Sequence, residues 1–185
     1  MNARQIFLGV LAIGSMGVTA IAAASTVQAT TVGVPPPMSS APTIEKLFDK
    51  WMLRCAEGVC QVFLTLADEK TKEAKVSWTF VYDPKSAKLS TIVQLPLSVA
   101  LPPGVRITVT EGTYYTWPFQ YCDGTGCRAV AVLTDKIVAS LKEQENVAVQ
   151  YIPYGEQKTV TYKIPMAGLS AATTELIATV KATKK

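Results

Sequence analysis

The chain has 185 residues, which is enough for one domain of ordinary size and too short for a typical two-domain enzyme. Its formal net charge is +4 and its basic residues are scattered, apart from Lys181, Lys184 and Lys185, so the sequence has no dense basic patch of the kind that binds nucleic acid. It contains no histidine, which excludes Ser-His and Cys-His catalytic pairs and removes the commonest metal ligand.

The N-terminal residues show the order of regions that is typical of a signal peptide. A charged start precedes an apolar run from Ile6 to Ala24, and small residues follow it. Two small-x-small sites fit cleavage, Ala22-Ala23-Ala24 and Val27-Gln28-Ala29, and the second is favoured because polar residues follow it. We therefore expect a cleaved signal peptide over residues 1–29 and a mature protein that is periplasmic, associated with the outer membrane, or secreted.

An uncleaved N-terminal anchor is the alternative, since an apolar stretch of about 18 residues can just span a bilayer. It would make the protein a periplasmic accessory subunit of a membrane assembly. Small and polar residues within the run weaken this hypothesis: Gly9, Gly14, Ser15, Gly17 and Thr19. A lipid anchor is disfavoured because no cysteine precedes Cys55.

Residues 30–42 consist mainly of Thr, Val, Pro and Ser and predict an extended linker. The folded domain is then expected over residues 43–185. Its first residues, with Thr43 as a cap, predict a short amphipathic helical turn. The apolar side of this turn is formed by Ile44, Leu47 and Phe48.

Alternation with a period of two dominates the rest of the domain and predicts strands with one buried face. The inward sets are Val76, Trp78, Phe80 and Tyr82; Val105, Ile107 and Val109; Val147, Val149 and Tyr151; and Val160, Tyr162 and Ile164. Two segments have helical periodicity instead, residues 135–144, with Thr134 or Asp135 as the cap, and residues 169–180. The sequence therefore predicts a mainly β domain, an antiparallel β-sandwich or barrel-like sheet with two short helices.

Four cysteines form two pairs with the same spacing, Cys55 with Cys60 and Cys122 with Cys127. They can form disulfides or hold a tetrahedral zinc ion, and export to an oxidising compartment favours disulfides, so no metal site is expected. Four cysteines allow three connectivities, and the sequence alone does not choose among them. The local pairing within each pair is favoured, because each pair brackets a glycine-containing turn between strand-like segments.

The sequence predicts no catalytic residue and no cofactor, and it contains no glycine-rich phosphate loop. A glycosidase with paired carboxylates is the remaining enzymatic hypothesis. It is weak because most of the acids fall at predicted turns: Asp68, Glu69, Asp83, Glu111, Asp123 and Asp135.

Aromatic residues are the candidates for a binding surface. Trp51 and Trp78 are predicted to lie in the core, the commoner location for a large aromatic residue. The adjacent Tyr114 and Tyr115 point to opposite faces of a predicted strand, so we expect one of them to be exposed. The exposed tyrosine is the better candidate for an interface.

Four segments, in this order along the chain, resemble one protein family. They are Trp51-Met52-Leu53-Arg54-Cys55 followed by Cys60, Leu95-Pro96-Leu97 to Leu101-Pro102-Pro103-Gly104-Val105, Pro118-Phe119-Gln120-Tyr121-Cys122 to Gly126-Cys127-Arg128-Ala129, and Gly168 to Ala172. The segments are similar to those of the invasion-associated locus B family, from Phe48 to Ile177. The resemblance implies an exported envelope protein of Gram-negative bacteria, associated in pathogenic members with entry into host cells, and it implies no enzymatic activity and no catalytic residues.

These observations together predict a non-enzymatic exported protein that acts by binding, in host-cell invasion or in a general envelope role. The expected partner is an unknown protein or other envelope component, without nucleic acid and without a small-molecule substrate. The binding surface is expected on a sheet face or on the loops near Cys122 to Cys127.

Overall fold

The structure is a computed structural model that describes residues 44–67 and 74–183. The predicted signal peptide and linker lie outside the described residues. The described strands are β1 (Ile44–Phe48), β2 (Trp51–Ala56), β3 (Val59–Ala67), β4 (Ala74–Asp83), β5 (Lys88–Leu95), β6 (Val105–Thr110), β7 (Thr113–Trp117), β8 (Phe119–Asp123), β9 (Gly126–Val132), β10 (Asn146–Tyr151) and β11 (Val160–Pro165). The described helices are α1 (Asp135–Lys142) and α2 (Leu169–Thr183), and neither is long and apolar enough to cross a membrane.

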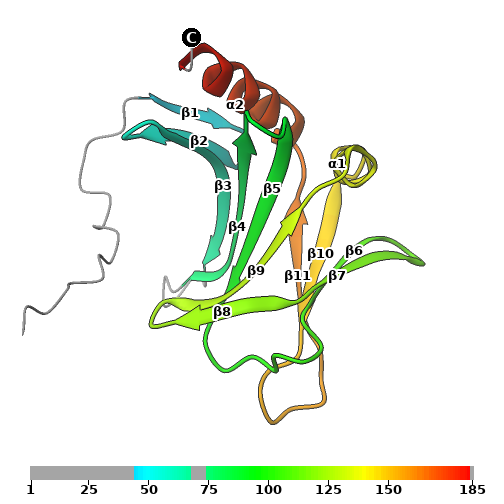
Figure 1. The fold of residues 1–185 in the computed structure, drawn as a ribbon. Helices are drawn as coiled ribbons and strands as arrows, with labels where there is room; N and C mark the ends of the chain where they lie inside the picture. Colours follow the sequence, from blue (N-terminus) through cyan, green and yellow to red (C-terminus); the bar gives the residue numbers. More distant parts are fainter. Residues whose placement is uncertain (1–43, 68–73, 184–185) are drawn as a thin grey trace, which may run out of the picture. The chain divides into compact units, whose positions relative to one another are not determined.

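The described strands form two antiparallel sheets (Figure 1). A seven-stranded sheet has the order β1-β2-β3-β4-β5-β9-β8, and a four-stranded sheet has the order β11-β10-β6-β7. The described chain passes between the sheets three times, after β5, after β7 and after β9, and the shortest passage is Pro118, between β7 and β8. Both sheets contribute apolar side chains to one hydrophobic core, which confirms the predicted antiparallel sandwich and excludes a closed barrel.

The predicted alternation is confirmed along most strands. In β4, Val76, Trp78 and Phe80 are buried, and the inward residues of β6 are buried in the same way. On β11 only Ile164 is buried, while Val160 and Tyr162 are half-buried. The difference arises because β11 is an edge strand of the four-stranded sheet, with a neighbour on one side.

The segment β1 is a strand, so the prediction of a helical turn is wrong. It pairs antiparallel with β2, from Ile44 opposite Cys55 to Phe48 opposite Trp51. Ile44 and Phe48 pack against the core, whereas Leu47 is exposed. A single helical turn is unstable alone, and pairing with β2 supplies the hydrogen bonds that such a turn lacks.

Both predicted helices are present, with the expected boundaries to within a few residues. Thr134 caps α1, its hydroxyl accepting a hydrogen bond from the Ile137 backbone N–H at 3.3 Å. Helix α2 packs against β1, β2, β3 and β4, as Figure 1 shows. The residues of α2 buried in this contact are Leu169, Ala172, Thr173, Leu176 and Val180.

An aromatic cluster fills the centre of the core. Trp78 contacts Trp51, Phe80 and Trp117, with ring centroids 6.3, 5.6 and 6.1 Å apart. The Trp51 indole N–H donates a hydrogen bond to the Pro165 carbonyl at 3.0 Å, which links β2 to the end of β11. Trp51 and Trp78 are fully buried, so their predicted place in the core is confirmed.

Candidate functional site

Each cysteine pair links the two strands of one hairpin in the seven-stranded sheet. Cys55 is bonded to Cys60 and Cys122 to Cys127, with sulfur–sulfur distances of 2.09 and 2.07 Å. Each pair is also in register between its two strands. The structure thus contains the local connectivity that the turn residues favoured, and no free cysteine remains among the described residues to bind zinc.

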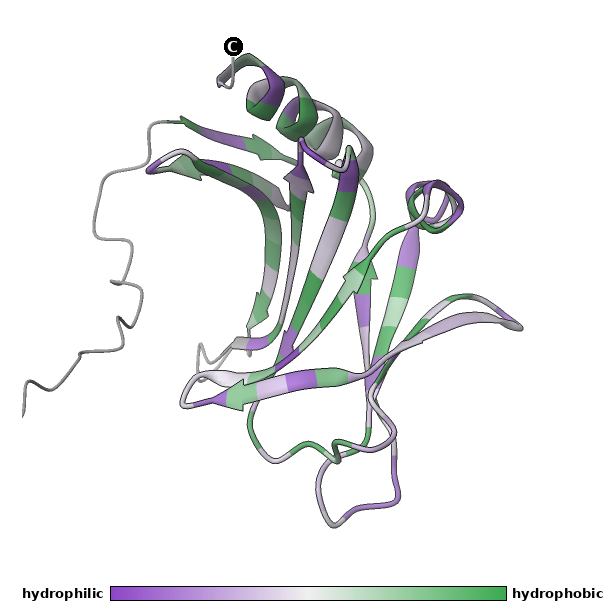
Figure 2. Cartoon of the chain, in the orientation of Figure 1, coloured by the Kyte–Doolittle hydropathy of each residue, from purple (hydrophilic) through white to green (hydrophobic). Residues whose placement is uncertain are grey.

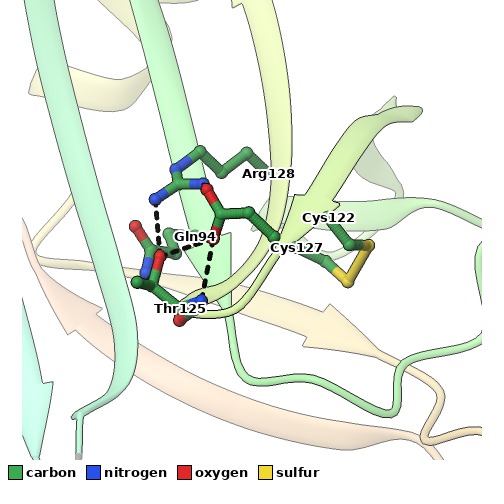
Figure 3. Close-up of a disulfide and its surroundings, with 6 residues drawn as sticks. Gln94, Cys122, Thr125, Cys127 and Arg128 are labelled. Atoms are coloured by element: carbon green, nitrogen blue, oxygen red, sulfur yellow. Dashed lines mark hydrogen bonds and ion pairs between the residues drawn. A yellow bond between two sulfur atoms is a disulfide. The ribbon is translucent and has the colours of Figure 1, made fainter. Parts of the chain in front are cut away.

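The Cys122–Cys127 hairpin is stabilised by a polar network in its turn (Figure 3). The Asp123 carboxylate accepts hydrogen bonds from the Thr125 backbone N–H at 2.8 Å and from the Thr125 hydroxyl at 2.6 Å, and it forms an ion pair with Arg128. The Gln94 side-chain amide donates to the Thr125 carbonyl at 3.0 Å, which ties the turn to β5. The Thr125 hydrogen bonds, side chain first, and then Arg128 lower the pKa of Asp123 to about 2. The Asp123 carboxylate therefore stabilises the turn between β8 and β9.

The other acids considered for a glycosidase lie in separate elements. Asp83 accepts hydrogen bonds from two backbone N–H groups in the turn between β4 and β5. Glu111 lies in the turn between β6 and β7, Asp135 begins α1, and Asp68 and Glu69 lie outside the described residues. Within residues 44–67 and 74–183, no three histidine, cysteine or acidic side chains are grouped so that they could hold a metal ion.

The outer face of the four-stranded sheet carries an open cavity of about 360 Å³. The register places Arg106 of β6 opposite Thr116 of β7 and opposite Gln150 of β10. The inward neighbours of Arg106 in β6 are buried in the core, so Arg106 points outward. The cavity is lined from the sheet by Arg106, Tyr114, Thr116, Gln150 and Tyr151, and from the adjoining loops by Pro103, Gly104, Ile152 and Thr159.

Arg106 supplies an available positive charge to this cavity. Its guanidinium lies over the Tyr114 ring, 3.6 Å from the centroid, which is a favourable cation–π geometry. Among the described residues, no carboxylate forms an ion pair with it. The guanidinium donors therefore remain free for a negatively charged or carbonyl-bearing ligand.

Gln150 is held in a fixed orientation beside Arg106. The Thr108 hydroxyl donates to its side-chain oxygen at 2.8 Å, and its amide nitrogen donates to the Thr161 hydroxyl at 3.2 Å. Each of these Gln150 atoms retains one further hydrogen-bonding position. The cavity thus combines a cation, an aromatic ring and an oriented carboxamide, the mixture typical of a ligand site.

A second hollow, of about 550 Å³, lies beside the turn between β4 and β5. Lys88 and Asp135 both line it, so its charges offset each other. Its remaining lining residues are short or aliphatic side chains that offer few hydrogen-bonding groups: Ser86, Ala87, Val132, Leu133 and Thr134. We therefore take the cavity at Arg106 as the candidate site.

Of the adjacent Tyr114 and Tyr115, the exposed one is the predicted interface residue, and the exposed one is Tyr114. It is 51% exposed and lines the cavity, whereas Tyr115 is half-buried with its hydroxyl 3.2 Å from that of Ser140. The prediction that one of these tyrosines is exposed is confirmed. Arg106 and Gln150 were not identified from the sequence, because only the strand register brings them together.

No curated protein sequence matches this chain. The crystal structure of invasion-associated protein B from Bartonella henselae matches with a TM-score of 0.68 and 20% sequence identity, over 75% of this chain and 99% of that one, which shows a common fold. The model of the invasion-associated locus B (IalB) protein family matches residues 51–176. This match covers strands β2 to β11 and the first half of α2, and the chain belongs to the invasion-associated locus B family.

Proposed function

We propose that this protein is an exported, non-enzymatic envelope protein that binds an anionic group in the cavity at Arg106. The observation that carries the proposal is the guanidinium that lies on Tyr114 in an open cavity without a carboxylate partner. Family membership supports a role at the envelope, in host-cell invasion or in a more general function. The partner is then an envelope or host-surface component that presents a negative charge.

Two features support export. The disulfides indicate an oxidising, extracytoplasmic compartment. The first 29 residues have the order of a signal peptide, and its removal would release the domain into the periplasm, to the outer membrane or to the medium.

The absence of catalytic groups supports binding as the activity. The sequence contains no histidine, and the described acids considered for catalysis belong to separate turns and a helix start. The cavity itself is lined by one cation and by neutral side chains, a set that suits recognition.

Intact mass of the protein purified from envelope fractions tests export. We expect a chain that begins at Thr30, with four cysteines that react with an alkylating agent only after reduction. A chain that retains Met1 would instead support a tethered subunit of a membrane assembly, and four reactive thiols before reduction would contradict the oxidised state.

Titration with inorganic phosphate tests the cavity. We expect the side-chain N–H signals of Arg106 and Gln150 to shift in NMR spectra, with an affinity of about 1 mM, typical of a single small-anion site. Arg106→Gln is expected to abolish the shift of Gln150. Lys163→Gln is the matched control, because Lys163 is an exposed cation of β11 on the same outer face but outside the cavity. Equal binding by the Arg106→Gln variant and the wild-type protein would contradict the proposal.

A further inference from the structure

Two loops meet at the end of the four-stranded sheet next to the cavity. They are residues 96–104, between β5 and β6, and residues 152–159, between β10 and β11. The Ala100 N–H donates to the Ile152 carbonyl and the Tyr154 N–H donates to the Ser98 carbonyl, both at 2.8 Å. The two loops are therefore joined through their backbones and form one surface.

This surface exposes three large apolar or aromatic side chains. Leu97 is 52% exposed, Leu101 51% and Tyr154 79%, and we call these three residues the apolar tip. Residues 96–104 contain no charged side chain, and Figure 2 shows green, hydrophobic stretches in this loop. Exposed apolar groups gathered on adjacent loops indicate a surface that leaves water when it binds.

The apolar tip adjoins the candidate anion site. Pro103 and Gly104 from the first loop and Ile152 and Thr159 from the second line the cavity that contains Arg106. A ligand that fills the cavity therefore lies beside side chains that favour an apolar environment. A small soluble anion would use the cavity and leave the leucines in water.

We propose that the apolar tip inserts into the surface of a lipid bilayer while Arg106 binds a lipid phosphate group. This inference rests on the proposed binding of an anion at Arg106. Leucine side chains partition into the acyl region and tyrosine into the interface, which fits the composition of the tip. The guanidinium of Arg106 in β6 can bind phosphate oxygens through paired N–H donors. The exposed Lys158 lies in the loop between β10 and β11, where Glu156 offsets its charge, so Arg106 supplies the net positive charge of this surface.

A bilayer fits this surface better than a protein partner does. Protein interfaces surround their apolar centre with polar groups that pair with the partner. Residues 96–104 provide no charged group for such pairing, and the two charges of the adjoining loop, Glu156 and Lys158, offset each other. A fluid bilayer has no fixed pattern of partners to match, and its phosphates lie at the depth where apolar and charged side chains meet.

Vesicle binding tests the proposal, using the protein purified from envelope fractions and vesicles of phosphatidylcholine and phosphatidylglycerol in equal amounts. The double variant Leu97→Ser with Leu101→Ser is expected to lose at least about tenfold in affinity, because two half-exposed leucines no longer enter the acyl region. The matched control is Val59→Ser with Val132→Ser, since these residues of β3 and β9 are 53% and 60% exposed. The control is expected to bind within about twofold of wild type, and Arg106→Gln is expected to weaken binding several-fold.

A second measurement follows insertion directly and removes no apolar group. Tyr154→Trp is expected to show fluorescence quenching by lipids with brominated acyl chains, whereas Val132→Trp is not. The native tryptophans Trp51, Trp78 and Trp117 are buried and give an unquenched background.

The outcomes separate the two proposals. Unquenched tryptophan at position 154, or vesicle binding by the double leucine variant equal to that of the control, overturns membrane docking. Absence of vesicle binding together with intact phosphate binding at Arg106 also overturns it and leaves the anion site standing. If the wild-type protein binds neither vesicles nor phosphate, both the membrane-docking proposal and the anion-site proposal are overturned.

Discussion

Replacing Trp51 with alanine is expected to lower the free energy of unfolding by about 4 kcal/mol, near the upper end for a single core substitution. The side chain is fully buried between Trp78 and Phe80, with ring centroids at 6.3 and 5.5 Å, so the truncation leaves a large cavity. It also removes the donor to the Pro165 carbonyl, an acceptor at the end of β11. Urea unfolding, followed by far-ultraviolet circular dichroism, measures the loss.

The Trp51→Phe variant separates the two contributions. It retains an aromatic ring between the same neighbours but has no N–H, so its expected loss is about 1 to 2 kcal/mol, for the missing hydrogen bond and a smaller cavity. If Trp51→Ala lowers the free energy of unfolding by less than about 2 kcal/mol, the packing of Trp51 in the aromatic cluster contributes less to stability than we expect.

Replacing Gly168 with alanine is expected to cost at least about 3 kcal/mol, although it adds one methyl group. Gly168 has φ +84°, and a Cβ there would lie 2.1 Å from the Phe48 carbonyl oxygen and 3.0 Å from the Asp49 Cβ. The first contact is with the last residue of β1 and the second with the turn that follows it, and the first is with backbone, which cannot rotate away. The substitution must therefore displace either the end of β1 with its turn or the start of α2.

Gly112→Ala is the matched control for this substitution. Gly112 has nearly the same backbone conformation, φ +81°, but a Cβ at that position would meet nothing within 4 Å. Its expected cost is about 1 to 2 kcal/mol, for the left-handed conformation alone. Chemical denaturation of both variants gives the difference, and equal losses would mean that the contact with Phe48 relaxes at no cost.

Local patterns in the sequence predicted most of the elements. Alternation in Val76, Trp78 and Phe80 identified β4 because both sides of that strand are paired and one face is fully buried. The same pattern failed to show that Val160 and Tyr162 remain half-exposed, since an edge strand has the same alternation as a central one.

The segment from Ile44 to Phe48 shows where a short pattern is ambiguous. Residues four apart lie on one face of a helix and also on one face of a strand, so the spacing of these two side chains fits both. Pairing with β2 makes this segment a strand and not a helical turn. The pairing is a tertiary contact, and the periodicity of five residues does not predict it.

The candidate site was only partly accessible from the sequence. Adjacent Tyr114 and Tyr115 must point to opposite faces of a strand, which identified one exposed tyrosine. Arg106 and Gln150 are distant in the sequence, and they meet because β10 pairs with β6 rather than with another strand. Strand partners and register depend on the packing of the whole core, so single-sequence patterns do not determine them.

Both disulfides link cysteines separated by five positions within one hairpin. In a reduced chain the nearest thiol to each cysteine is therefore its native partner, and the entropy of loop closure favours it over the cysteines of the other hairpin, which lie far along the chain. Each bond can form as soon as its own turn forms, independently of the sheets. During oxidative folding the two disulfides therefore form independently, each by closing a short loop, and the chain does not have to sample all three pairings. Little catalysis is then needed to reshuffle mispaired disulfides.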